Sequence, residues 1–132
     1  MRDFSQDHRW LSINTATVRK QGDLLAIFDA CARHGIRCVS PWRDQVATVG
    51  LKAAAKSVRD HGLVLSGYCR GGMMTSDAAH VQEARDDNRR AVDEALTLGA
   101  PCLVLVVGGL PKNADGAPAS KDLAGARAMV RD

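Results

Sequence analysis

Aromatic residues make up only 4% of this 132-residue chain, and neither sign of charge dominates it. The formal net charge is +3, and basic residues alternate with acidic ones, as in segment 85–90. Such mixing is typical of a solvated helix face. A nucleic-acid interface needs a one-sided basic stripe interleaved with aromatic side chains. We therefore expect no nucleic-acid partner.

Long hydrophobic runs and closely spaced cysteine pairs are also lacking. The main apolar run, Cys102–Val107, is far shorter than the ~20 residues that span a bilayer. Segment 1–9 is polar and charged, unlike a signal peptide. The cysteines at positions 31, 38, 69 and 102 lack the spacing of zinc or redox motifs, so we expect buried, reduced thiols. These features predict a cytoplasmic protein without a membrane partner.

The apolar run itself carries the strongest structural signal. Cys102–Val107 stands between Gly99-Ala100-Pro101 and Gly108-Gly109. An uninterrupted Val- and Leu-rich run predicts a parallel strand buried on both faces. The two glycines after it lack side chains that would block a ligand from approaching the backbone.

Four strand–loop–helix units can be placed along the chain. We expect strands at 10–13, 36–40, 63–69 and 102–107. The expected helices cover 24–34 and 46–61, a third helix ends near 98, and a fourth begins at 123. Asp23 is the expected N-cap of the first helix, whose apolar positions are 24, 27, 28 and 31. The junction His34-Gly35-Ile36 recurs as His61-Gly62-Leu63, so helix-to-strand turns are short and marked by glycine.

This asymmetry between short and long connections indicates a fold class. Short helix-to-strand turns and longer, chemically varied strand-to-helix loops are typical of a (β/α)8 barrel, with function on the loops that follow the strands. An open doubly wound parallel sheet is the alternative. A complete barrel needs ~200 residues or more. We therefore predict that residues 1–132 form one domain, a truncated half-barrel of four β/α units, with 1–9 as a mobile tail.

A half-barrel leaves two strand edges open. Exposed edges are templates for pairing with another chain. We therefore expect this chain to form a homodimer that closes the barrel, or else to aggregate.

Three segments resemble a known family. They are Ser40-Pro41-Trp42-Arg43-Asp44, the 87–95 helix and the 99–109 strand with its flanking glycines, and they resemble the sugar phosphate isomerase/epimerase family of xylose-isomerase-like TIM barrels. The resemblance implies metal-assisted proton transfer beside the carbonyl of a sugar or polyol substrate. It also implies a divalent metal (Mn, Mg or Zn) bound by two Glu, one Asp and one His of the second half. No metal ligand or catalytic residue is therefore assigned in this chain.

Other functions stay open, because the chain alone holds only half of such an enzyme. It could be a non-catalytic α/β domain that binds a small anion, or an inactive fragment. The endonuclease IV branch of the same family places histidine ligands at early strand ends. Here the third and fourth strands end in Cys69-Arg70 and Gly108-Gly109, which argues against an AP endonuclease.

Five residues after the predicted strands are candidates for substrate binding: Trp42, Arg43, Arg70, Gly108 and Gly109. A Trp offers an apolar wall to the CH face of a sugar, and an Arg binds phosphate or carboxylate through two hydrogen bonds. The structural alternatives are a Trp packed over the barrel rim, an Arg43–Asp44 surface pair, and a tight turn at the glycines.

Overall fold

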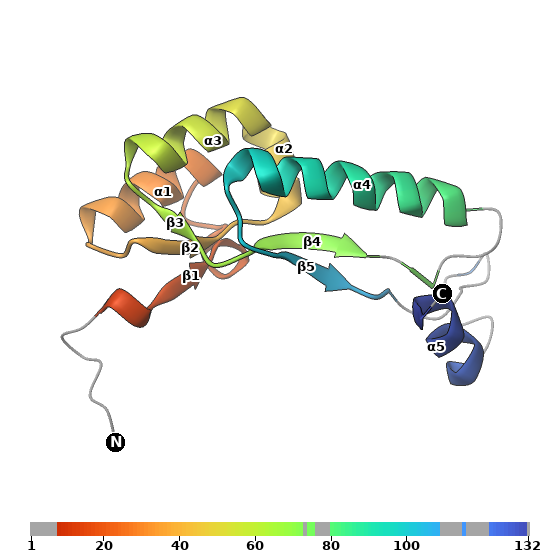
Figure 1. The fold of residues 1–132 in the computed structure, drawn as a ribbon. Coiled ribbons are helices and arrows are strands. Elements are labelled where there is room, and N and C mark those ends of the chain that lie inside the picture. The colour runs from red at the N-terminus through yellow and green to blue at the C-terminus, as the bar shows by residue number, and fades with distance from the viewer. Residues whose placement is uncertain (1–7, 73, 76–79, 109–114, 116–121, 132) are drawn as a thin grey trace, which may run out of the picture.

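The computed structural model describes residues 8–72, 74–75, 80–108, 115 and 122–131 (Figure 1). Within them, strands alternate with helices along the chain. The strands are β1 (Ser12–Asn14), β2 (Cys38–Ser40), β3 (Val64–Leu65), β4 (Tyr68–Gly72) and β5 (Leu103–Val106). The α-helices are α1 (Leu24–Arg33), α2 (Arg43–Val49), α3 (Leu51–Asp60), α4 (Val81–Leu98) and α5 (Leu123–Arg131). Two 3-10 turns, η1 (His8–Trp10) and η2 (Thr15–Val18), flank β1; residues 1–7 of the expected tail lie outside the described residues.

The strands are parallel and follow one another in sequence order. β1 pairs with β2, β2 with β3, and β4 with β5. The predicted strand 63–69 is divided into β3, in a three-stranded sheet with β1 and β2, and β4, in a two-stranded sheet with β5, and it continues to Gly72. Beyond β3 it still contacts the second unit, because the Cys69 N–H donates to the Pro41 carbonyl at 3.0 Å. The order of four successive units is thus the one we predicted.

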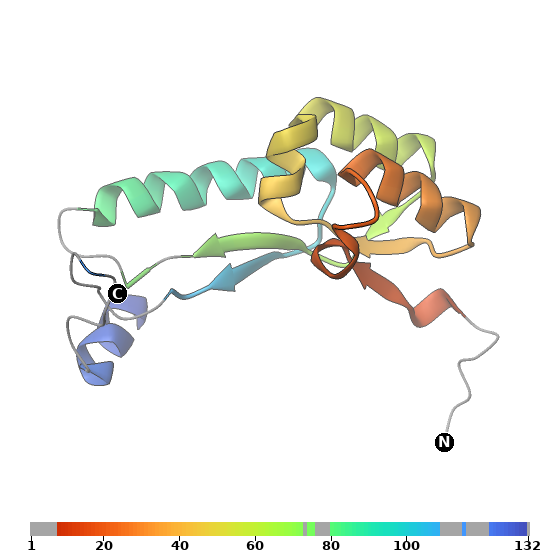
Figure 2. The same ribbon diagram turned by 180° about the vertical axis from the view of Figure 1, so that it is seen from behind.

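The helices distinguish a barrel from an open sheet. Figures 1 and 2 show α1 to α4 over the same face of the strands, while α5 lies beyond the ends of β4 and β5. A doubly wound sheet carries helices on both faces. One covered face and sequential parallel order describe an arc of a TIM barrel, which confirms the predicted fold class.

The repeated helix-to-strand junctions have one geometry. After α1 the Ile36 N–H donates to Cys31 O, and after α3 the Leu63 N–H donates to Val58 O, both at 2.9 Å. The same bond follows α4, where Gly99 adopts a left-handed conformation with φ of 73°. This is the Schellman termination, which requires a residue that tolerates positive φ. The repeat seen in the sequence is therefore a structural repeat.

The predicted helix 46–61 is wrong in two respects. Helix α2 begins at Arg43, inside the expected loop, with Trp42 at its N-cap position. The helix then ends at Gly50, and α3 starts immediately after it. Gly50 has φ of 89°, a value that a helical residue does not adopt, so the helix stops there. The apolar residues keep their helical spacing on both sides of Gly50, and the sequence pattern therefore did not reveal the break.

The core lies between the helices and the strands. Asp23 caps α1 as predicted, accepting from the Ala26 N–H at 2.9 Å, and all four predicted apolar positions of α1 are buried. The buried cluster consists of Leu24, Ile27, Phe28, Cys31, Val39, Val46, Ala54, Ala55, Val58, Leu63, Leu65, Tyr68, Ala95 and Leu98. None of the helices in the described part of the chain is long and apolar enough to cross a membrane.

Strand β5 corrects a second expectation. We predicted a strand buried on both faces, but Val104, Leu105 and Val106 are 43%, 47% and 38% exposed. Among the described residues β5 pairs only with β4, in a two-stranded sheet, and the face opposite the helices is uncovered. The apolar composition is that of a central barrel strand, whereas its surroundings here are those of an edge. The cysteines are unpaired, with Cys31 and Cys69 buried, but Cys102, at the start of this edge, is exposed.

Candidate functional site

A cavity of about 550 Å³ is lined by residues of β4, by residues of α2 and α4, and by Trp42, which follows β2. It brings together three of the predicted residues: Trp42, Arg43 and Arg70. The other lining residues are Arg19, Asp44, Val46, Ala47, Leu51, Tyr68, Gly71, Gly72, Asp87 and Glu94. Two of the predicted residues, Trp42 and Arg43, lie just after β2, in the kind of loop on which β/α barrels carry active-site residues.

Trp42 is held by contacts from the first unit. Its indole Nε1–H donates to Asn14 Oδ1 at 2.7 Å, and that oxygen also accepts from the Ala16 N–H at 3.1 Å. The Arg19 guanidinium lies 5.7 Å from the centre of the Trp42 ring, and it pairs with Asp44 at 3.1 Å. The ring is thus fixed at the rim of the cavity before any ligand binds.

Arg43 lies at the centre of a polar network. Its Nε and Nη2 donate to the two oxygens of Glu94 at 2.7 and 3.0 Å, and its Nη1 donates to Asp87 at 2.5 Å. The Tyr68 hydroxyl donates to Glu94 at 2.9 Å. The Arg43 side chain is 19% exposed and that of Glu94 is 25% exposed. The bidentate pair therefore joins the start of α2 to the middle of α4.

Protonation in this network follows from its contacts. Burial alone would raise the pKa of Glu94, but hydrogen bonds from Arg43 and Tyr68 outweigh burial and lower it. The hydrogen bond from Arg43 also lowers the pKa of Asp87. Burial, and then the bond to Glu94, raise the pKa of Tyr68 well above 10. At neutral pH both carboxylates are ionised and the tyrosine is protonated.

Arg43 was predicted as a substrate ligand, and the structure places it at the cavity. Three of its N–H groups already bind carboxylates, and its partners are Asp87 and Glu94 rather than Asp44. In this structure Arg43 therefore links α2 to α4 in the wall of the cavity.

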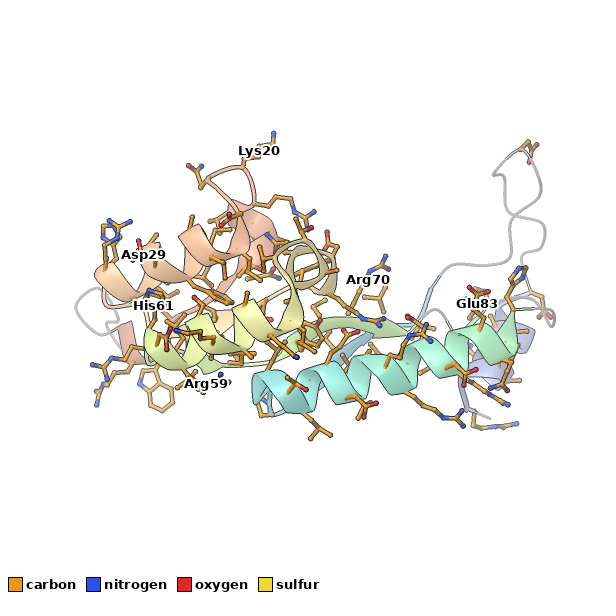
Figure 3. All side chains as sticks on the ribbon, turned by 90° about the horizontal axis from the view of Figure 1, so that it is seen from above. Lys20, Asp29, Arg59, His61, Arg70 and Glu83 are labelled. Atoms are coloured by element: carbon orange, nitrogen blue, oxygen red, sulfur yellow. The ribbon has the colours of Figure 1, made fainter. Side chains whose placement is uncertain are left out.

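Arg70 is directed outward by a β-bulge. In the pairing of β4 with β5, Cys69 is opposite Val104 and Gly71 is opposite Leu105, so Arg70 is the extra residue. A bulge of this kind redirects one side chain. Arg70 is exposed, and Figure 3 shows it in the space between the α1–α2 region and α4.

Two glycines make this bulge sterically possible. A Cβ on Gly71 would lie 2.9 Å from Asn88 Oδ1 and from Leu103 Cδ2, and a Cβ on Gly72 would collide with the backbone of Val106. Asn88 fixes the end of β4, since its amide accepts from the Gly72 N–H and donates to the Gly72 carbonyl at 2.9 Å. The position of Arg70 is therefore set by backbone contacts on both sides.

The remaining predicted residues are located elsewhere or outside the described part. Gly108 comes shortly after β5 and has φ of 99°. It is not one of the described residues that line the cavity. Gly109 lies outside the described residues.

Four charged or polar residues of the cavity were not predicted from the sequence: Arg19, Tyr68, Asp87 and Glu94. Asp87 and Glu94 are seven residues apart on one helix, a spacing that puts both carboxylates on the same face. Tyr68 is the chain's single tyrosine and lies in a predicted strand. These features could have indicated the two carboxylates and the tyrosine. Nothing in the sequence indicates that Arg43 pairs with Glu94, because the two residues are 51 positions apart.

Metal ligation was tested on the same residues. Within the part of the chain that the structure describes, no three His, Cys, Asp or Glu side chains lie close enough to hold a metal ion. Asp87 and Glu94 are both engaged by Arg43. The described residues thus do not fit the metal centre that the resemblance implies.

Comparison with known proteins adds a family and a fold. The family model for a xylose isomerase-like TIM barrel matches residues 28–132. The crystal structure of protein SMc04130 from Sinorhizobium meliloti 1021 is 52% identical, with a TM-score of 0.84 over 93% of this chain and 43% of that one. A xylose isomerase-like TIM barrel/4-hydroxyphenylpyruvate dioxygenase fusion protein is similar in fold alone, at 18% identity and a TM-score of 0.63 over 80% of this chain and 17% of that one. No curated protein matches. The chain spans about two fifths of the length of the Sinorhizobium protein.

Proposed function

This chain belongs to the xylose isomerase-like TIM barrel family, and we propose that it supplies the substrate-binding half of a sugar isomerase or epimerase. The observation that carries the proposal is this cavity, whose lining includes both Trp42 and Arg70. Loops that follow the strands, such as the one with Trp42 after β2, carry the active sites of β/α barrels. The substrate class is a sugar or a related polyol.

The composition of the cavity supports a hydroxyl-rich ligand. Its lining contains three arginines and three carboxylates, so the charges balance. Balanced charge gives little attraction for a polyanion, whereas a polyol can donate to carboxylates and accept from guanidinium groups. In this proposal Trp42 contacts the CH face of the ligand, and Arg70 binds a hydroxyl, carboxylate or phosphate group.

Arg43, Glu94, Asp87 and Tyr68 act as positioning residues. Their network holds α2, which starts next to Trp42, against α4, which anchors the end of β4 through Asn88. The two sides of the cavity, formed by α2 and β4, are therefore both held by α4. Loss of the network is expected to loosen ligand binding without removing a ligand contact.

The proposed reaction in the intact barrel is proton transfer beside a carbonyl, in which a divalent metal (Mn, Mg or Zn) assists. Since the described residues do not fit a metal, we assign its ligands and the proton-transferring carboxylate to residues outside them, and we derive no step through it. A cytoplasmic setting, in which the four cysteines stay reduced, is part of the proposal.

Tryptophan fluorescence tests the binding step. The chain contains only Trp10 and Trp42, so the variant Trp10→Phe reports on Trp42 alone. Titration with pentoses, hexoses, their phosphates and polyols should give a saturable change with at least one of them. Arg70→Met should weaken that binding about tenfold or more, the effect of losing ~1.4 kcal/mol. Arg59→Met, a distant exposed arginine on α3, is the matched control and should leave binding unchanged.

A second candidate, binding of a small anion without turnover, depends on the exposed Arg70 in the cavity lining, since an arginine can bind phosphate or carboxylate through two hydrogen bonds. The same titration separates the two functions. Saturation by phosphate or sulfate with no response to any neutral sugar would support the anion-binding function and contradict the proposed one.

A further inference from the structure

The three arginines that line the cavity are held in different ways. Arg43 is 19% exposed and donates three hydrogen bonds to two carboxylates. Arg70 is exposed and forms the bulge of β4. Arg19, which follows η2, pairs with Asp44 through Nη1 and Oδ2 at 3.1 Å. The charge of Arg19 is thus neutralised by a carboxylate on α2, the helix that starts next to Trp42.

The Arg19–Asp44 pair can separate without disturbing the fold. The two side chains are 45% and 58% exposed, and exposed ion pairs contribute little to stability. The same two residues also line a second, smaller cavity of about 280 Å³. The pair therefore borders open space in two cavities. Arg19 can exchange Asp44 for another anion while the backbone stays in place.

A ligand that contacts Trp42 would also come within reach of Arg19. The guanidinium lies 5.7 Å from the centre of the Trp42 ring, which is within the range of a cation–π contact. The ring itself is fixed by the hydrogen bond from its Nε1–H to Asn14. A phosphate or carboxylate group on the ligand would then compete with Asp44 for the Arg19 guanidinium.

The negative charge of Asp44 also acts beyond this pair. Burial is the main cause of the raised pKa of Tyr68 and of Cys69, and the charge of Asp44 adds to both shifts. At Cys69 the positive charge of Arg70 acts in the opposite direction. Asp44 and Arg70 thus influence the same region of β4. Asp44 offsets part of the positive potential that would attract an anion there.

We propose that Asp44 is a specificity-determining residue that disfavours anionic ligands in the cavity. It occupies the Arg19 guanidinium and offsets the charge of Arg70. The substrate class would then be a neutral sugar or polyol, bound in preference to its phosphorylated or acidic counterpart. This choice of sugar rests on the proposed function, whereas the discrimination against anions does not and is measured with inorganic phosphate alone.

A phosphate titration of the 15N-labelled chain, followed through the Trp42 indole N–H signal, measures the discrimination. Asp44→Asn keeps the shape of the side chain and removes its charge, so phosphate should bind about tenfold more tightly or better. The gain should shrink as sodium chloride is added, because salt screens the attraction. Asp29→Asn is the matched control on α1, since it also removes an exposed carboxylate that pairs with an arginine, and it should leave phosphate binding unchanged (Figure 3).

A double variant tests whether Arg19 is the group that Asp44 withholds. In Arg19→Met/Asp44→Asn most of the gain in phosphate affinity should be lost. Equal phosphate affinities of the unchanged chain and Asp44→Asn would overturn the inference, and so would a gain that persists in full in the double variant. Circular dichroism checks the fold of each variant. If Asp44→Asn is unfolded, Asp44→Ser removes the same charge and decides in its place.

Glucose and glucose 6-phosphate then connect the discrimination to the substrate. The unchanged chain should bind glucose more tightly than its phosphate, and Asp44→Asn should tighten binding of the phosphate while glucose affinity stays the same. An unchanged chain that prefers glucose 6-phosphate would overturn the inference. A chain that responds to no sugar, but whose Asp44→Asn variant gains phosphate affinity, would contradict the proposed function and support the role of Asp44.

Discussion

Replacing Arg43 by Met should destabilise the chain far more than replacing an ordinary surface arginine. The change removes three hydrogen bonds and leaves Glu94, a largely buried carboxylate, with the Tyr68 hydroxyl as its remaining bonded partner. Removing one partner of a fully buried pair costs about 3–5 kcal/mol. Because both side chains retain some contact with water, we expect roughly half of that, about 2 kcal/mol.

Urea denaturation followed by circular dichroism measures this cost. With a slope of about 2 kcal/mol/M, the midpoint should fall by roughly 1 M urea. The matched control is Arg33→Met, which removes an exposed i,i+4 pair with Asp29 and should cost less than about 0.5 kcal/mol.

A double-mutant cycle with Glu94→Gln isolates the pair itself. The single change Glu94→Gln keeps an acceptor for Tyr68 and should cost about 1 kcal/mol, and the coupling energy between Arg43 and Glu94 should be about 1–2 kcal/mol. Equal midpoints for Arg43→Met and Arg33→Met, or a coupling energy near zero, would refute the role assigned to the network.

Three further predictions follow from the same contacts. The lowered pKa of Glu94 stabilises the fold above the carboxylate's unfolded pKa, near 4.3, so the urea midpoint should fall as the pH drops below about 4.5, and less steeply in Arg43→Met. A flat midpoint between pH 6 and 3 would contradict this sign. Gly72→Ala should lower the free energy of unfolding by more than the ~1 kcal/mol expected of Gly99→Ala. Both changes add the strain of a positive φ, but only Gly72→Ala adds a collision with the backbone. Equal denaturation midpoints of the two variants would show that the collision is relieved. Tyr68, the single tyrosine, should show no phenolate absorbance in the folded chain at pH 10–11, where an exposed tyrosine ionises.

Local sequence patterns were sufficient for much of the fold. The Asp23 cap, the apolar positions of α1 and the repeated glycine junctions each depend on residues within one helical turn of one another. Such features are encoded where they act, so composition and spacing reveal them. The sequential parallel order then follows from the short junctions.

Features that depend on distant neighbours could not be predicted in the same way. The exposure of Val104 is decided by what lies next to β5 and not by its own sequence. The partners of Arg43 come from a helix 44 and 51 residues further along the chain. The bulge at Arg70 depends on the register between β4 and β5. Trp42 and Arg43 were nevertheless found, because they lie just after β2, as active-site residues of barrels do; Arg70 also lines the cavity, although it lies within β4 and not after it.

The central claim, that the cavity lined by Trp42 and Arg70 binds a sugar, is tested most directly by an NMR titration of the 15N-labelled chain. The two indole N–H signals and the amides of Gly71 and Gly72 report on the site, with Trp10 as an internal control. During titration with a pentose or hexose we predict saturable shifts of the Trp42 indole and the two glycine amides, with the Trp10 indole unchanged. Shifts that do not saturate, or that leave the Trp42 indole and both glycines unmoved, would contradict the proposed function.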